Sequence, residues 1–95
     1  MSVYVDPMFP CMTNANWRWR ESCHLWADTE NELHDFAARI GLRRAWYQKD
    51  ATLPHYDLTS GRRVKAVALG AIEVSRADFA ALIRQRRGMS EQPQA

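Results

Sequence analysis

The stretch CHLWADTENELHDFAARIG, residues 23–41, decides the fold. Residues 23–27 are typical of a β-strand because apolar and aromatic side chains dominate them. Thr29 and Glu32 then have the spacing of a capping box, in which each side chain accepts a hydrogen bond from the backbone N–H of the other residue. Gly41 stands where the following helix ends. The helix is expected to bury one apolar stripe, made of Leu33, Phe36, Ala37 and Ile40.

Further strand and helix candidates lie on both sides of this stretch. Residues 3–5, 45–48 and 71–74 are strand candidates. Helices are expected from Thr59 or Ser60 to Gly70 and again after Ser75. Residues 7–21 read as a long loop, and residues 49–58 as a loop or a broken edge strand.

This order corresponds to two consecutive βαβ units, whose crossovers favour parallel strands. We therefore predict an α/β fold: a single small domain over residues 1–87, with a three- to four-stranded, largely parallel sheet and three helices. Residues 88–95 are expected to form a flexible C-terminal tail.

Length and composition limit the class of protein. The chain has 95 residues, 46% of them hydrophobic and 25% charged, which suits one globular domain with no second lobe. No run approaches the roughly 20 apolar residues of a membrane helix, and the first residues lack the features of a signal peptide. We therefore expect a cytoplasmic protein with no membrane partner and with reduced cysteines. Its many aromatic residues favour a homodimer.

Charge is distributed unevenly along the chain. Residues 1–40 carry three basic and six acidic side chains, a net charge of −3, whereas residues 41–95 carry ten and five, a net charge of +5. A basic half favours a phosphorylated ligand or nucleic acid as partner. Solvated helix faces would give much of the same asymmetry.

Polar residues gather at the expected carboxyl ends of the strands, where open α/β sheets bind ligands. They are Asp6, Asp28, Gln48 and the group His55-Tyr56-Asp57. Asp6, Asp28 and Asp57 form a candidate site for Mg²⁺ or Mn²⁺. His55 is the candidate general acid or base, with Tyr56 and Asp57 beside it as further catalytic candidates. The simpler alternative is that each carboxylate only caps a helix or a turn.

Another polar group starts a predicted helix. Thr59, Ser60, Arg62 and Arg63 place hydroxyl and guanidinium groups where free backbone N–H groups favour an anion. This predicts a phosphate-binding site, although the spacing of a Walker-type loop is absent. An ordinary helix cap followed by solvated arginines explains the same residues.

A zinc site is a further hypothesis. Cys11, Cys23, His24 and His34 include the residue types that bind zinc, but no Cys-x-x-Cys pair is present. A contact one helical turn away with Glu30 explains His34, and half-burial in a strand explains His24.

The segment Trp17-Arg18-Trp19-Arg20 alternates indole and guanidinium groups. If it is extended, both indoles lie on one face and both guanidiniums on the other. Such a face suits stacking on the bases of a single strand, or else the completion of a small core or a dimer seam.

Several segments together resemble the domain-of-unknown-function family 4031, which consists of short bacterial and bacteriophage proteins. The resemblance runs from Val3 to about Ile83, and His55-Tyr56-Asp57 is its most specific part. The other segments are residues 3–6, 23–28, 32–34, 46–48, 58–59 and 70–75. The resemblance implies no activity, but it implies a pattern of polar residues at Asp6, His24, Asp28, Gln48, His55, Tyr56 and Asp57.

Three hypotheses for the function follow from these residues. The first is a metal-dependent phosphodiesterase or nuclease that acts on nucleic acid or a nucleotide, with phosphate neutralised by Arg62 and Arg63. The second is a non-catalytic module that binds nucleic acid or a protein. In the third, the His-Tyr-Asp group is a buried hydrogen-bond network that fixes its loop.

Overall fold

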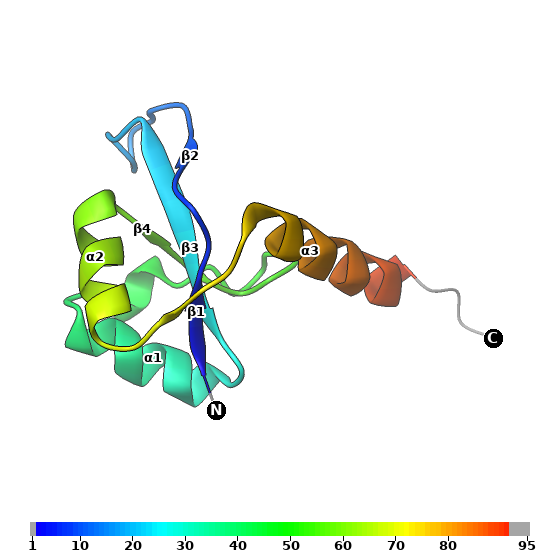
Figure 1. Ribbon diagram of the computed structural model, residues 1–95. Helices are drawn as coiled ribbons and strands as arrows, with labels where there is room; N and C mark the ends of the chain where they lie inside the picture. The colour runs from blue at the N-terminus through cyan, green and yellow to red at the C-terminus, as the bar shows by residue number, and fades with distance from the viewer. Residues whose placement is uncertain (1, 92–95) are drawn as a thin grey trace.

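A computed structural model describes residues 2–91 of the chain. Within these residues lie the strands β1 (Val3–Val5), β2 (Phe9–Pro10), β3 (Glu21–Ala27), β4 (Tyr56–Leu58) and β5 (Ile72–Glu73). The helices are α1 (Glu30–Arg39), α2 (Ser60–Ala68) and α3 (Arg76–Glu91), with a short 3₁₀ helix, η1 (Arg44–Trp46), after α1. Figure 1 shows α1 and α2 on one side of the strands and α3 on the other. The α/β class is confirmed.

The sheet is mixed and is organised around β3. Strands β1 and β4 lie on opposite edges of β3, because Leu25 pairs with both Val5 and Tyr56. The pairings of β3 with β1, β2 and β4 are all antiparallel, whereas β5 joins β1 in parallel. The prediction of a largely parallel sheet is therefore wrong. After α1 the chain runs through η1 and a turn before β4 begins, and this extra segment lets β4 enter the sheet antiparallel to β3.

The main core lies between the sheet and the two helices α1 and α2. Side chains along a strand alternate between its faces, so Cys23 and Leu25 of β3 point to the same side. Both are fully buried, together with Val5 and Leu58. Helix α1 adds the apolar stripe predicted from its sequence, and Leu33, Phe36, Ala37 and Ile40 are all buried. Thr29 caps this helix as expected, since its hydroxyl accepts a hydrogen bond from the Glu32 N–H group.

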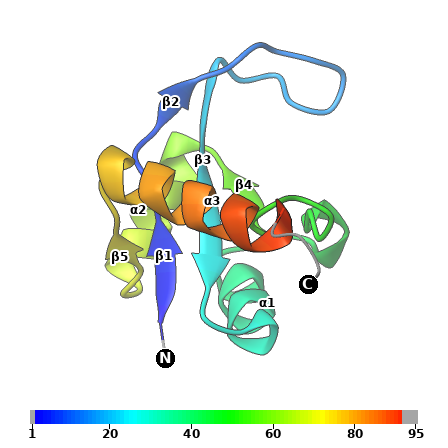
Figure 2. The same ribbon diagram turned by 90° about the vertical axis from the view of Figure 1, so that its right-hand side faces the viewer.

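The opposite face of the sheet is covered by α3. Phe79 of this helix stacks on His24 and packs against Trp26, with ring centroids 4.9 and 5.2 Å apart. Figure 2 shows α3 running across β3 and β4. This face therefore combines aromatic packing with polar side chains, whereas the α1 and α2 face forms the apolar core.

Several predicted elements need correction. Residues 45–48 form the end of η1 and a single bridge between Gln48 and His55, not a strand. The predicted loop over 7–21 contains β2 and the start of β3, and Figure 2 shows its tip projecting from the body of the protein. Helix α3 continues past Gly88 to Glu91, into the stretch predicted as a tail, of which residues 92–95 lie outside the described part. None of the described helices is long and apolar enough to cross a membrane.

Candidate metal centre

Three side chains with metal-binding atoms meet on the α3 face of the sheet. Asp57 lies opposite His24 in the register of β4 and β3, so the two side chains are neighbours on one face. His55 precedes Asp57 by two residues and shares this face because of strand alternation. One potential ligand atom from each residue lies within 4.8 Å of the other two. The cluster thus offers two imidazole nitrogens and one carboxylate oxygen at short range.

A second polar group holds each of the three side chains. The Asp6 carboxylate accepts a hydrogen bond from the His24 backbone N–H at 2.6 Å and contacts His24 Nδ1 at 2.9 Å. The Leu53 carbonyl oxygen lies 2.6 Å from His55 Nδ1. Gln48 donates its amide N–H to the second oxygen of Asp57. Since Nδ1 of both histidines has an acceptor, Nε2 is the atom each presents to the cluster.

Aromatic rings fix the orientation of His24. Its imidazole is stacked between Phe9 of β2 and Phe79 of α3, with ring centroids 5.1 and 4.9 Å away. The ring of His55 meets His24 edge-on at 4.6 Å. This packing restricts the imidazole to one plane, so its nitrogens point in fixed directions.

Charge is balanced locally in this cluster. His55 Nε2 lies 3.3 Å from the Asp57 carboxylate. Burial by itself lowers the pKa of His55, but the hydrogen bonds to Asp57 and to the Leu53 carbonyl, with the charges of Asp57 and Asp6, outweigh it and raise the pKa. Burial by itself raises the pKa of Asp57, but His55 and the Gln48 amide outweigh it and lower the pKa. His55 and Asp57 are therefore a hydrogen-bonded pair, in which each side chain favours the charged form of the other.

The donor set suits some metal ions better than others. Imidazole nitrogen is a good ligand for zinc and iron, whereas Mg²⁺ prefers oxygen atoms and water. Histidine ligands in proteins usually donate their other N–H to a carboxylate or a backbone carbonyl, as Asp6 and Leu53 allow here. Two histidines and one carboxylate also leave coordination positions open for water or a substrate.

The predicted site residues are divided between several places. Asp6 contacts Nδ1 of His24 and orients this ring next to the cluster. Asp28 follows the end of β3, where it accepts hydrogen bonds from the Ser2 N–H and the Tyr4 hydroxyl, both at 2.8 Å. Tyr56 points into the opposite face and is 1% exposed, with its hydroxyl 2.8 Å from His34 Nδ1. Neither Asp28 nor Tyr56 belongs to the cluster.

Of the residues predicted to bind phosphate, Thr59, Arg62 and Arg63 have protein partners. Thr59 caps α2 by accepting the Arg62 N–H at 3.3 Å, and Ser60 is the exposed first residue of this helix. Arg62 donates to the Ile40 carbonyl at 2.6 Å. Arg63 donates to the Asp6 carbonyl at 2.9 Å and pairs with Glu73 at 3.2 Å. These contacts tie α2 to α1, β1 and β5, so both arginines have structural partners.

The residues considered for zinc do not come together. Cys23 and His34 lie on the core side of the sheet, away from His24, and Cys11 lies in the loop after β2. Burial raises the pKa of the Cys23 thiol to about 12, which disfavours the thiolate that a metal needs.

Two hollows flank the cluster. A groove of about 830 Å³ is lined by Gln48, Asp57, the start of α2, η1 and the tip of the loop between β2 and β3. A smaller hollow of about 340 Å³ lies against α3 and is lined by His24 and His55. The larger groove is also lined by Trp17, Trp19 and Trp46, and we call it the tryptophan groove. Asp57 is thus the member of the cluster in the groove wall, whereas His24 and His55 line the smaller hollow.

Sequence reasoning missed some contributors to this site. The Leu53 carbonyl and the rings of Phe9 and Phe79 have no local sequence signal, since a backbone acceptor and apolar packing look the same everywhere. Trp46 lies in η1, whereas its sequence surroundings predict a strand. Period two places His55 and Asp57 on one face of a strand, but Pro54 favours a loop or a broken edge strand over residues 49–58, and a loop does not specify which side chains share a face.

Comparison with known proteins identifies the family. The profile of the family described as "Protein of unknown function (DUF4031)" matches residues 3–86, and the chain belongs to this family. The match confirms the resemblance seen in the sequence. No curated protein and no solved structure matches the chain.

Proposed function

We propose that this member of the DUF4031 family is a divalent-metal-dependent phosphodiesterase that acts on nucleic acid or a nucleotide. The observation that carries the proposal is the cluster of His24, His55 and Asp57, whose ligand atoms lie within 4.8 Å of one another. Each of these side chains is oriented by an outer partner: Asp6, the Leu53 carbonyl or Gln48. Such support is usual for metal ligands.

The choice of Zn²⁺ or Mn²⁺ as the ion follows from the donors. Two nitrogen ligands disfavour Mg²⁺ and suit Zn²⁺, whereas the Asp57 carboxylate and the positions left open for water suit Mn²⁺. Both ions support hydrolysis. When bound, the ion would lower the pKa of a coordinated water and withdraw charge from a phosphoryl oxygen. His24, His55 and Asp57 would hold it, and Asp6 would keep the His24 ring in its ligating orientation.

Phosphodiester hydrolysis fits the surroundings of this cluster. The oxygen of water bonds to phosphorus, one P–O ester bond breaks, and the leaving oxygen takes a proton, giving a phosphomonoester and a hydroxyl group. No nucleophilic side chain is required for this reaction. Asp57 connects the cluster to the tryptophan groove, and Arg62 in the groove wall supplies positive charge. The basic half of the chain favours an anionic substrate.

A structural hydrogen-bond network is the main competing interpretation. The contacts Asp6–His24 and His55–Asp57 satisfy these side chains without an ion. A purely structural network should bind no metal, and substitutions in it should change stability alone. The two interpretations therefore differ in a measurable way.

An activity assay tests the proposal. Metal-free protein is incubated with Zn²⁺ or Mn²⁺ and either bis(p-nitrophenyl) phosphate or a labelled oligonucleotide. We expect turnover that requires the ion and is lost in Asp57→Asn. Asp28→Asn is the matched control, because it changes an exposed carboxylate outside the cluster and should retain turnover. Absence of turnover with every ion, or equal turnover in Asp57→Asn, would contradict the proposal.

A further inference from the structure

We infer that the tryptophan groove binds a single strand of nucleic acid, with unpaired bases stacked on its indoles and the backbone phosphates near the arginines of its rim. This inference deepens the proposed phosphodiesterase function and rests on it for the fate of the bound strand. The indoles of the groove are partly exposed, arginines lie around them, and Asp57 of the metal cluster lies in the groove wall.

The indoles of the groove are not part of the core. Trp19 is 41% exposed and Trp46 is 47% exposed, whereas Trp26 under α3 is 5% exposed. Trp17 is fixed by a hydrogen bond from its indole N–H to the Glu21 carbonyl at 3.3 Å, and it meets Trp19 edge-on at 4.8 Å. Large aromatic surfaces that are held in place but left partly open are suited to stacking on a planar ligand.

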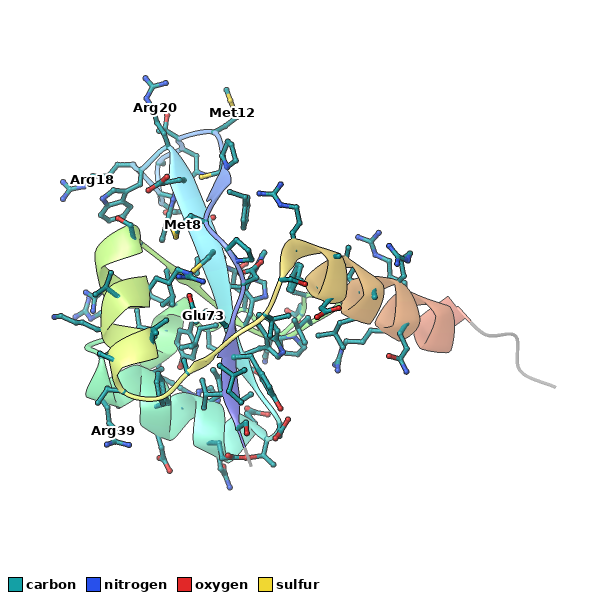
Figure 3. All side chains as sticks on the ribbon, viewed as in Figure 1. Met8, Met12, Arg18, Arg20, Arg39 and Glu73 are labelled. Carbon is teal, nitrogen blue, oxygen red and sulfur yellow. The ribbon has the colours of Figure 1, made fainter. Side chains whose placement is uncertain are left out.

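Positive charge surrounds these indoles. The Arg18 guanidinium lies 5.0 Å from the ring centre of Trp19, and that of Arg62 lies 5.9 Å from the ring centre of Trp46. Arg20 lies at the same loop tip, and Figure 3 shows Arg18 and Arg20 projecting outward from it. Arg43 and Arg44 come directly before the groove residues Ala45 and Trp46. The one carboxylate in the groove wall, Asp57, is paired with His55.

The composition of the groove distinguishes a nucleic acid from an apolar partner. Amide side chains of Asn14, Asn16 and Gln48 line the walls beside the indoles. Amides can hydrogen-bond base edges, indoles stack on base faces, and guanidiniums neutralise phosphates, so the three kinds of group together match a polynucleotide. An apolar helix would leave these amides and guanidiniums without partners.

A single strand fits better than a duplex. Bases in a duplex stack on each other and are not available to indole rings, whereas unpaired bases stack on aromatic side chains. The groove volume of about 830 Å³ lies within the roughly 300–1,000 Å³ of pockets that hold a small molecule, which suits one or two nucleotides. Asp57 in the groove wall would bring the backbone of such a strand to the candidate metal centre.

Fluorescence anisotropy with a labelled oligothymidylate, in the presence of a chelator and at low salt, tests the inference. We expect binding to the single strand in preference to a duplex of equal length. Trp19→Ala and Trp46→Ala should each weaken binding by about 5- to 150-fold, the range for loss of one stacked base. Leu69→Ala is the matched control, since Leu69 is 44% exposed and does not line the groove, and it should bind as the wild type does.

Two other outcomes would overturn the inference: equal binding of single strand and duplex, or unchanged binding in both tryptophan variants. The same protein with Zn²⁺ or Mn²⁺ and bis(p-nitrophenyl) phosphate separates the two proposals. Strand binding without metal-dependent turnover would leave a non-catalytic binding module, so that only the phosphodiesterase function fails. Turnover of the small diester without strand binding would mean that only the groove inference fails.

Discussion

Both faces of the sheet carry histidines with polar partners, but the two groups are arranged differently. On the α3 face, His24, His55 and Asp57 direct their polar atoms toward one another. On the α1 face, Tyr56 and His34 form a linear chain of hydrogen bonds that ends at Glu30 near the surface. Burial raises the pKa of Tyr56, whereas on the other face the contacts of Asp57 with His55 and Gln48 outweigh burial and lower the pKa of Asp57. Convergence of ligand atoms, and not the residue types, makes the first face a candidate site.

Removing one histidine from each face gives the largest expected difference in metal affinity. His24→Ala should weaken binding of Zn²⁺ or Mn²⁺ by more than the roughly 10–100-fold loss that follows removal of an outer partner. His34→Ala should leave the affinity unchanged, because His34 lies on the other face. Competition with a coloured chelator measures both affinities. Equal losses in the two variants would remove the distinction between the faces.

The outer partner of His24 gives the next effect. Asp6→Asn keeps the size of the side chain but removes the negative charge beside His24 Nδ1, and we expect metal affinity to fall by about 10–100-fold. The substitution also affects folding, since Asp6 is 3% exposed and accepts the His24 N–H. Circular dichroism identifies the folded fraction used in the titration. An affinity like that of the wild type in folded protein would rule out a supporting role for Asp6.

Removal of one hydroxyl tests the core face. Tyr56→Phe deletes the hydrogen bond to His34 Nδ1 and should lower the free energy of unfolding by about 1 kcal/mol. Metal affinity should not change, because the hydroxyl points away from the cluster. Urea denaturation and the metal titration are measured on the same preparation. A large loss of metal affinity would show that the two faces are coupled.

The smallest effect is expected at Asp28, which belongs to neither network. Hydrogen bonds from the Tyr4 hydroxyl and the Ser2 N–H lower the pKa of this carboxyl below its ordinary value of 3.8. A lowered folded-state pKa stabilises the protein above the unfolded-state value, and this contribution is lost as the pH falls through the folded-state pKa. The stability advantage of the wild type over Asp28→Asn should therefore be present near neutral pH and disappear in acid. A difference that does not change with pH, in denaturant titrations, would contradict this assignment.

Local sequence patterns predicted the elements near each helix start. The caps at Thr29 and Thr59 and the apolar stripe of α1 depend on spacing within one or two turns, and the structure shows all three. Of the predicted capping box, the structure shows the bond from the Glu32 N–H to Thr29, while the Glu32 carboxylate accepts from the Thr29 hydroxyl at 2.9 Å. The direction of β4 depends instead on how residues 42–55 travel between α1 and the sheet. No sequence pattern in this segment indicates that direction. The prediction of parallel strands was therefore wrong for β4, which pairs antiparallel with β3.

The candidate site shows the same division between local and distant information. The positions of strand ends singled out Asp6, Gln48, His55 and Asp57, and the family resemblance added His24. The structure brings these five residues together. Asp28 also follows a strand and was predicted to join them. It comes after the last residue of β3, where its partners are Ser2 and Tyr4 and not the cluster. Whether two strand ends share an edge of the sheet depends on strand direction, which single-sequence patterns do not contain.

Calorimetric titration of Zn²⁺ and Mn²⁺ into metal-free protein tests the central claim most directly, because it needs no substrate. We predict saturable binding at one site in the wild type and in Asp28→Asn, and loss of this binding in Asp57→Asn. Absence of binding in the wild type, or equal binding in Asp57→Asn, would contradict the account and leave the cluster as a structural hydrogen-bond network.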